Sequence, residues 1–174
     1  MTLDDLEQWL TAVASTESNT VEKLIEHLFL AELLQECWFR RRQLVEVLRS
    51  EVDAAGYDLI LESGGLIRHV QLKAIRRGAR TSKQTVNARL EQRKGGCIIW
   101  IFYSVNSANY RGELSYRWRE AANLPATRET HTRGGRERER ERENTRVIPK
   151  SDFEEVPTIS ALVDRLFGDG AAES

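Results

Sequence analysis

Three polar residues in the middle of the chain have side chains that suit one hydrolytic site: Asp58, Gln71 and Lys73. Hydrolysis of a phosphodiester needs positive charge near the phosphorane oxygens and a hydroxide formed at neutral pH, and a magnesium ion held by hard oxygen ligands supplies both. Asp58 would give the anionic ligand and Gln71 a side-chain carbonyl, with the backbone carbonyl of Leu72 beside it. Lys73 would orient the attacking water or stabilise the transition state through a charge-assisted hydrogen bond.

A β-hairpin is the element expected to bring these side chains together. Residues 57–63, YDLILES, and 66–74, LIRHVQLKA, have the composition of strands and are separated by Gly64-Gly65. Because glycine tolerates the positive φ angles of a two-residue hairpin turn, Ser63 should pair with Leu66. Counting back along both strands then puts Asp58 opposite Gln71, and the alternation of side chains puts Lys73 on the same face.

The other patterned segments predict helices on either side of a sheet. Apolar residues recur at helical spacing in 3–13, in a longer segment that Thr20 caps, and in 159–167. Residues 44–48 read as a short strand, and the apolar run 97–104, CIIWIFYS, as a central strand covered on both faces. Residues 106–127 give at most one edge strand, while 74–94 fit either a short helix or an extended segment. The pattern predicts an α/β fold with a central mixed sheet flanked by helices.

The length and composition indicate a single domain over residues 1–174. The chain has 174 residues, of which 40% are hydrophobic, enough for one core of ordinary size. Residues 128–146, RETHTRGGRERERERENTR, alternate arginine and glutamate too densely to bury a core, so we expect an exposed loop or mobile arm there. Residues 147–168 should form a C-terminal strand and helix.

Several classes of protein are disfavoured by composition. No segment approaches the roughly 20 consecutive apolar residues of a membrane helix, and the first residues, MTLDDLEQW, do not resemble a secretory signal, so we expect a cytoplasmic protein that does not bind membranes. Cys37 and Cys97 are the only cysteines and lie in apolar segments, which argues against a zinc site.

The charges are distributed unevenly although the net charge is only −1. Acids dominate the first 36 residues, whereas nine bases face the single acid Glu91 between positions 68 and 94. Four of these bases follow Lys73 closely and are the predicted contacts to nucleic-acid phosphates: Arg76, Arg77, Arg80 and Lys83.

The pattern Asp58, twelve residues, Gln71-Leu72-Lys73 resembles the PD-(D/E)xK nuclease superfamily, in which an aspartate on one strand precedes (D/E/Q)xK on the next. The QxK version is similar to that of type IV restriction endonucleases. The resemblance covers about residues 20–105 and implies a restriction-endonuclease-like core. It also implies Mg²⁺ or Mn²⁺ as cofactor and a nucleic-acid substrate, DNA in the first place, which many such nucleases cut as homodimers.

The resemblance extends upstream of Asp58. The segments LAELL around Glu32 and VEVLRS around Arg49 are similar, in order and nearly in spacing, to the helix and strand that precede the metal-binding aspartate in archaeal Holliday-junction resolvases. This similarity implies Glu32 as a third metal ligand with Asp58 and Gln71. Glu36, one helical turn later, is the alternative.

The sequence therefore favours a Mg²⁺-dependent endonuclease in which Asp58, Gln71, Glu32 and Lys73 are catalytic. The alternative is a catalytically inactive module of the same fold that binds nucleic acid or a protein partner. A third reading is a small non-enzymatic protein in which Asp58 and Lys73 form an ion pair.

Overall fold

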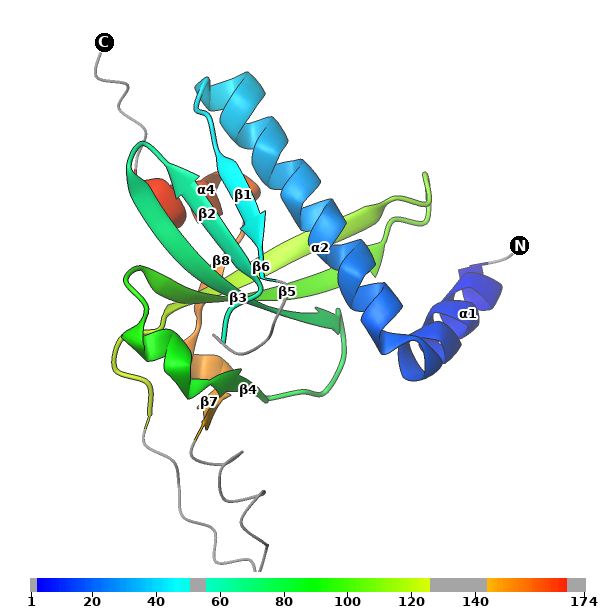
Figure 1. Ribbon diagram of the computed structural model, residues 1–174. Coiled ribbons are helices and arrows are strands. Elements are labelled where there is room, and N and C mark those ends of the chain that lie inside the picture. The colour runs from blue at the N-terminus through cyan, green and yellow to red at the C-terminus, as the bar shows by residue number, and fades with distance from the viewer. Residues whose placement is uncertain (1–2, 51–55, 126–143, 169–174) are drawn as a thin grey trace, which may run out of the picture.

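The structure is a computed structural model that describes residues 3–50, 56–125 and 144–168 (Figure 1). Its elements, in chain order, are α1 (Leu3–Thr16), α2 (Ser18–Gln35), the π-helix η1 (Glu36–Arg41), β1 (Glu46–Arg49), β2 (Leu59–Ser63), β3 (Leu66–Arg76), β4 (Lys83–Asn87), the 3₁₀-helix η2 (Ala88–Gln92), β5 (Gly96–Val105), β6 (Gly112–Glu120), β7 (Thr145–Pro149), the 3₁₀-helix η3 (Lys150–Asp152), β8 (Glu154–Val156) and α4 (Ile159–Phe167).

A mixed six-stranded sheet forms the centre of the molecule, in the order β1-β2-β3-β5-β6-β8. The β3–β5 pair is parallel and its neighbours are antiparallel. This confirms the predicted α/β class with a central mixed sheet. The expectation of a single edge strand within 106–127 was wrong, because β6 lies inside the sheet between β5 and β8.

The sheet has a separate hydrophobic cluster on each face. On one face, α2 and α4 pack on side chains from the central strands, among them Leu59, Val70 and Ile99. On the other, Ile98 and Trp100 of β5 contact Val86 of β4, and β4 pairs with β7 in a second, two-stranded sheet. The segment 74–94, which the sequence left undecided, thus contains the end of β3, then β4 and η2. Figure 1 shows α2 crossing the sheet and the β4–β7 pair at its lower end.

The predicted hairpin is present, but its pairing stops one residue early. Gly64 and Gly65 have φ angles of 57° and 77°, and Ser63 pairs with Leu66 as expected. The last paired residues are Leu59 and Val70, because the chain bends at Asp58, whose amide donates to the Val70 carbonyl at 2.9 Å. Asp58 is therefore not the cross-strand partner of Gln71.

The exposed loop or mobile arm expected at residues 128–146 falls mostly outside this description. Residues 128–143 of this segment lie outside the described residues, whereas Thr145–Pro149 beyond them form β7. Of the helices described, none is both long and apolar enough to span a lipid bilayer.

Candidate active site

The candidate site lies at the edge of β3 where β2 turns away. The His69 amide donates to the Gly95 carbonyl beside β5, so alternate residues of β3, namely Val70, Leu72 and Ala74, direct their backbone polar groups to the opposite side. The Leu72 amide donates to Asp58 Oδ2 at 2.7 Å. The Asp58 carboxylate thus accepts the hydrogen bond that a backbone carbonyl of β2 would accept if the pairing continued. This bond fixes the carboxylate relative to β3.

A cavity of about 580 Å³ opens at this edge. The first half of α2 forms one wall, β3 forms the floor, and β4 contributes Gln84 from the other side. Asp58, Gln71 and Lys73 all line this cavity, so the structure brings the three predicted residues together. Leu72 and Ala74, whose side chains point to the opposite face of β3, line the same cavity. The cavity therefore lies at the edge of the sheet and not over one face.

Glu26 is the α2 carboxylate most buried in this cavity. Its side chain is 7% exposed, and Lys23 Nζ donates to Oε2 at 2.7 Å. Arg49 Nε of β1 lies 2.9 Å from Oε1 as an ion pair, although this oxygen is buried without an aligned hydrogen-bond donor. The exposed Glu22 also lines the cavity one turn earlier.

The two glutamates that the sequence favoured as metal ligands do not reach this cavity. Both line a different pocket, on the α4 side of α2. Glu32 Oε2 accepts a hydrogen bond from the Tyr116 hydroxyl at 2.5 Å. Burial, together with this bond and the charge of Glu32, raises the pKa of Tyr116. Glu32 therefore joins α2 to β6, and the helix carboxylate of the candidate site is Glu26.

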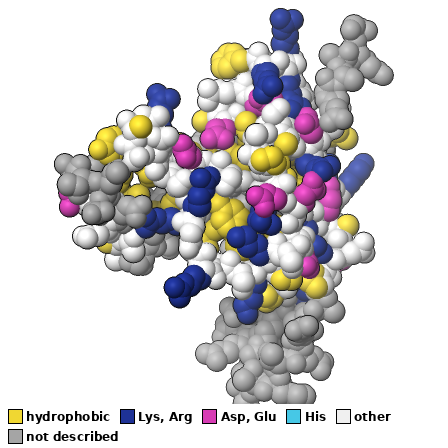
Figure 2. Space-filling model, turned by 180° about the vertical axis from the view of Figure 1, so that it is seen from behind, with side chains coloured by type: hydrophobic (Ala, Val, Ile, Leu, Met, Phe, Trp, Pro, Cys, Tyr) yellow, Lys and Arg dark blue, Asp and Glu magenta, His cyan; other side chains and the backbone are white. Residues whose placement is uncertain are grey.

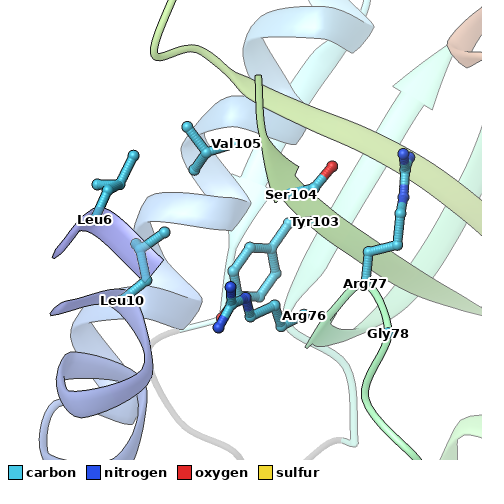
Figure 3. Close-up of a pocket in the computed structure, with 8 residues that line it drawn as sticks. All are labelled: Leu6, Leu10, Arg76, Arg77, Gly78, Tyr103, Ser104 and Val105. Carbon is cyan, nitrogen blue, oxygen red and sulfur yellow. The ribbon is translucent and has the colours of Figure 1, made fainter. Parts of the chain in front are cut away.

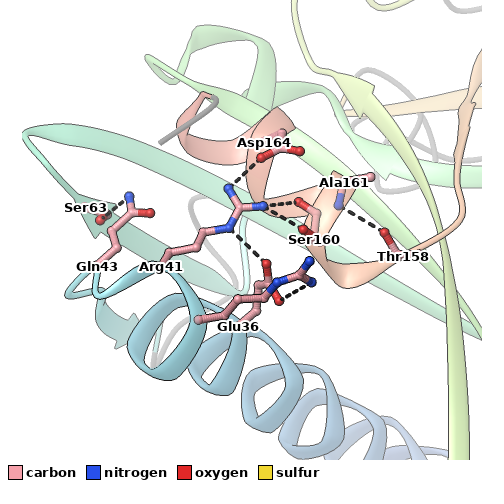
Figure 4. Close-up of polar contacts among 9 residues, drawn as sticks. Glu36, Arg41, Gln43, Ser63, Thr158, Ser160, Ala161 and Asp164 are labelled. Atoms are coloured by element: carbon pink, nitrogen blue, oxygen red, sulfur yellow. Dashed lines mark hydrogen bonds and ion pairs between the residues drawn. The ribbon is translucent and has the colours of Figure 1, made fainter. Parts of the chain in front are cut away.

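Glu36 belongs to a polar network that fastens η1 to α4 (Figure 4). Arg41 Nε donates to Glu36 Oε1 at 3.0 Å, and the same guanidinium contacts Asp164 at 2.5 Å and the Ser160 carbonyl at 2.7 Å. Burial alone would raise the pKa of Glu36, but hydrogen bonds from Arg41 and Ser160 and the charges of Arg40 and Arg41 outweigh it, so the pKa lies below its ordinary value. Glu36 is thus committed to a structural contact.

Gln71 and Lys73 differ in how firmly the protein holds them. Gln71 is 7% exposed, and its Oε1 accepts a hydrogen bond from the backbone N–H of Asn87 at 3.0 Å. This bond connects β3 to the end of β4. Lys73 is half-buried, and within the described residues no hydrogen bond or ion pair engages its ammonium. The ion pair with Asp58 that a non-enzymatic reading required is therefore not formed.

The predicted phosphate contacts lie beyond Lys73. Arg76 and Arg77 end β3, Arg80 is exposed in the following turn, and Lys83 begins β4 beside the cavity residue Gln84. Arg76 donates to Thr11 Oγ1 at 2.7 Å and Arg77 to Ser115 Oγ at 3.3 Å. Figure 2, which views the molecule from behind, shows basic side chains interspersed with acidic and hydrophobic ones.

The residues around the cavity fit a divalent cation in kind. Asp58 and Glu26 supply carboxylates, Glu26 Oε1 is a buried oxygen without a hydrogen bond, and the amide oxygen of Gln71 has a second lone pair. The Leu72 carbonyl faces the same edge. In the described ranges, no three His, Cys, Asp or Glu side chains form a metal-binding group, so a cation here would need an amide and a backbone oxygen beside the two acids.

Sequence reasoning missed Glu26 and Asn87, and it named Arg49 only as part of the strand motif before Asp58. The signal for Glu26 was its position four and seven residues before Leu30 and Leu33, on the buried stripe of α2. A glutamate on that stripe needs a polar partner, whereas Glu22 is exposed. No sequence pattern predicted that Arg49 and Asn87 would contact site residues, because strand pairing brings them there from distant parts of the chain.

Comparison of the sequence with protein-family models gives no match, and comparison with curated proteins gives none either. The geometry of the cavity and the motif resemblance therefore carry the functional interpretation.

Proposed function

We propose that this protein is a divalent-metal-dependent nuclease that hydrolyses phosphodiester bonds of DNA. The observation that carries the proposal is the convergence of Asp58, Gln71, Lys73 and Glu26 on one cavity at the edge of β3. The PD-(D/E)xK resemblance supports it, with Gln71 in the place of the commoner acid, and implies the restriction-endonuclease-like architecture as part of the same proposal.

Each polar group has a defined part in binding and orientation. Asp58, Glu26 and Gln71, with the Leu72 carbonyl, would hold Mg²⁺ or Mn²⁺. When bound, the cation would lower the pKa of a water molecule and neutralise charge on the phosphate. The Leu72 amide orients Asp58, Arg49 and Lys23 hold Glu26, and the Asn87 amide orients Gln71.

Lys73 is the group that would act on the reacting atoms. Its ammonium is half-buried at the cavity and is not engaged by another described residue. It would donate a hydrogen bond to the attacking water, which orients the oxygen, or to a phosphorane oxygen, where negative charge develops. Arg80 and Lys83 would hold the phosphates on either side.

The test is incubation of the protein with supercoiled plasmid and with single-stranded DNA, in Mg²⁺, in Mn²⁺ and in EDTA. Wild type should cleave only with metal, and Asp58→Ala and Lys73→Ala should each remove cleavage. The matched controls Asp152→Ala and Lys94→Ala change exposed residues outside the cavity and should cleave like wild type. Cleavage that survives in Asp58→Ala, or that the controls lose equally, contradicts the proposal.

The second candidate is a nucleic-acid-binding module of this fold without catalysis. One observation favours it: the protein already engages the Gln71 oxygen and both sides of the Glu26 carboxylate. Such a module would bind DNA in gel-shift experiments, leave it intact with either metal, and show no rise in melting temperature when Mg²⁺ is added.

A further inference from the structure

A second cavity lies between α1 and the ends of β3 and β5. It has a volume of about 220 Å³, and Leu6, Leu10, Arg76 and Tyr103 are among its lining residues (Figure 3). Pockets for drug-sized ligands measure roughly 300–1,000 Å³, so a cavity of this size suits a single ring-sized group.

Tyr103 gives this cavity a hydrogen-bonding group on a largely buried residue. Its side chain is 8% exposed, and within the described residues its hydroxyl has no hydrogen-bond partner. Figure 3 shows the ring pointing from β5 into the space beside Leu10 and Arg76. Burial raises the pKa of Tyr103, although the charge of Arg76 opposes this shift, so the phenol is a neutral donor at physiological pH. The hydroxyl keeps access to the open cavity, so it can donate to a ligand there.

Arg76 gives the same cavity a positively charged group. One guanidinium nitrogen donates to Thr11 Oγ1 of α1 at 2.7 Å, which holds the side chain against the cavity. A guanidinium has five N–H donors in a planar arrangement that matches a phosphate. The cavity therefore combines an apolar wall from Leu6 and Leu10, a phenol, and a group suited to phosphate.

The second cavity adjoins the candidate active site along the same two strands. Ala74 of β3 and Ile101 of β5 line the larger cavity, whereas Arg76 and Tyr103, two residues further along each strand, line the smaller one. Two residues of a strand span about 7 Å and return to the same face of the sheet. A strand of nucleic acid that follows this face out of the larger cavity, which Lys73 also lines, would therefore bring a neighbouring nucleotide to Arg76 and Tyr103.

We propose that this second cavity binds an unpaired nucleotide next to the scissile phosphate, with the base between Leu10 and Tyr103 and the phosphate on Arg76. The inference rests on the proposed nuclease function and names its substrate class: DNA with an unpaired or terminal nucleotide at the cut. A base within an intact duplex remains stacked and paired, so it would not enter the cavity.

The first experiment measures binding by calorimetry in EDTA, where cleavage plays no part. The probes are a deoxynucleoside 5′-monophosphate, the corresponding deoxynucleoside and inorganic phosphate. The monophosphate should bind most tightly, because it alone uses both the guanidinium and the apolar wall. Arg76→Gln and Leu10→Trp, which remove the charge and fill the cavity, should each weaken binding roughly tenfold or more, the scale of one stacked base.

Two controls separate this result from unfolding and from general charge effects. Arg42→Gln removes an exposed arginine after η1, at the other end of α2, and should bind the monophosphate like wild type. Circular dichroism should show that Arg76→Gln and Leu10→Trp keep the fold of wild type. Equal binding by Arg76→Gln, Leu10→Trp and wild type, or the absence of monophosphate binding, overturns the inference.

The second experiment distinguishes a free mononucleotide from a nucleotide within a strand. Binding and Mg²⁺-dependent cleavage are compared for a single-stranded oligonucleotide, a duplex with an unpaired tail and a blunt duplex of the same sequence. Preference for the first two, lost in Leu10→Trp, supports the inference; equal cleavage of all three overturns it while the nuclease proposal stands. Monophosphate binding without cleavage of any DNA overturns the nuclease proposal, and with it the substrate assignment.

Discussion

Glu26 and Glu32 lie on the same helix, but their carboxylates contact different parts of the protein. Glu26 is buried in the candidate active site beside Lys23 and Arg49, whereas Glu32 accepts a hydrogen bond from Tyr116 of β6. The two residues therefore allow a direct comparison between a carboxylate at the proposed catalytic cavity and one that joins α2 to β6.

We expect Glu26→Gln to reduce Mg²⁺-dependent DNA cleavage by about 100-fold or more, the scale of removing one group that stabilises charge in a transition state. Glu32→Gln should retain cleavage and instead destabilise the fold by about 1–2 kcal/mol, because its charge no longer strengthens the bond from Tyr116. Plasmid-nicking rates and urea unfolding measure the two effects. Loss of cleavage in Glu32→Gln with Glu26→Gln active would return the helix ligand to Glu32.

At the scale of elements, the contact between η1 and α4 depends on Glu36 and Arg41. The folded protein lowers the pKa of Glu36, so ionised Glu36 stabilises the fold above the unfolded value of about 4.5. That contribution is lost as the pH falls through the folded pKa, when the carboxyl is protonated in both states.

Glu36→Gln should therefore lower the free energy of unfolding by about 2 kcal/mol near neutral pH, since it removes a charge-assisted bond from a buried position. The difference from wild type should shrink below about pH 4.5. Urea denaturation at pH 7, 5, 4 and 3 measures it. The matched control is Glu155→Gln. Glu155 forms an ion pair with Arg117, but its side chain is 74% exposed, so this substitution should change the free energy of unfolding by at most about 1 kcal/mol. A Glu36→Gln deficit that does not depend on pH would contradict this account.

The turn before β5 places its backbone against the β2–β3 hairpin. Gly95 has a φ of 66°, and a Cβ there would lie 2.3 Å from the Ile67 carbonyl oxygen. Gly78 has a φ of 88° but nothing within 4 Å of the same position. We expect Gly78→Ala to cost about 1 kcal/mol from backbone strain alone.

Gly95→Ala should lower the free energy of unfolding by about 3 kcal/mol or more, because the backbone strain and the clash with the Ile67 carbonyl add. Thermal unfolding of the two variants compares them. Equal destabilisation would show that the Gly95 turn can move away from Ile67.

The elements that the sequence predicted well are those with local signals. Gly64-Gly65 predicted the hairpin register as far as Leu59, and the apolar run at 97–104 predicted β5. The pairing of β4 with β7 could not be predicted, because their short polar sequences meet only across a long stretch of chain. Asp58, Gln71 and Lys73 were placed together correctly, but Glu26 was not chosen because its partner Arg49 arrives from β1.

At the scale of the whole molecule, the net charge does not by itself attract nucleic acid. The net charge is −1, and acidic side chains lie among the basic ones in Figure 2. Affinity for DNA should therefore come from a few phosphate contacts close to the cavity, and its dependence on salt should be shallow.

We expect Arg80→Gln and Lys83→Gln each to reduce the slope of log K against log salt by about 1, the effect of one lost phosphate contact. Fluorescence anisotropy with labelled DNA in EDTA, over a range of salt concentrations, measures the slope. Lys94→Gln serves as the control and should leave it unchanged. Slopes that are equal in all four proteins would remove Arg80 and Lys83 from the interface.

The β4–β7 pair also sets when during synthesis the site can be completed. Asn87, which orients Gln71, ends β4, and β4 is held by Thr145–Pro149 near the C-terminal end of the chain. A ribosome-bound chain halted before Thr145 would have Asp58, Gln71 and Lys73 but no strand to secure β4. The site of the proposed nuclease would thus be completed only after most of the polypeptide has emerged.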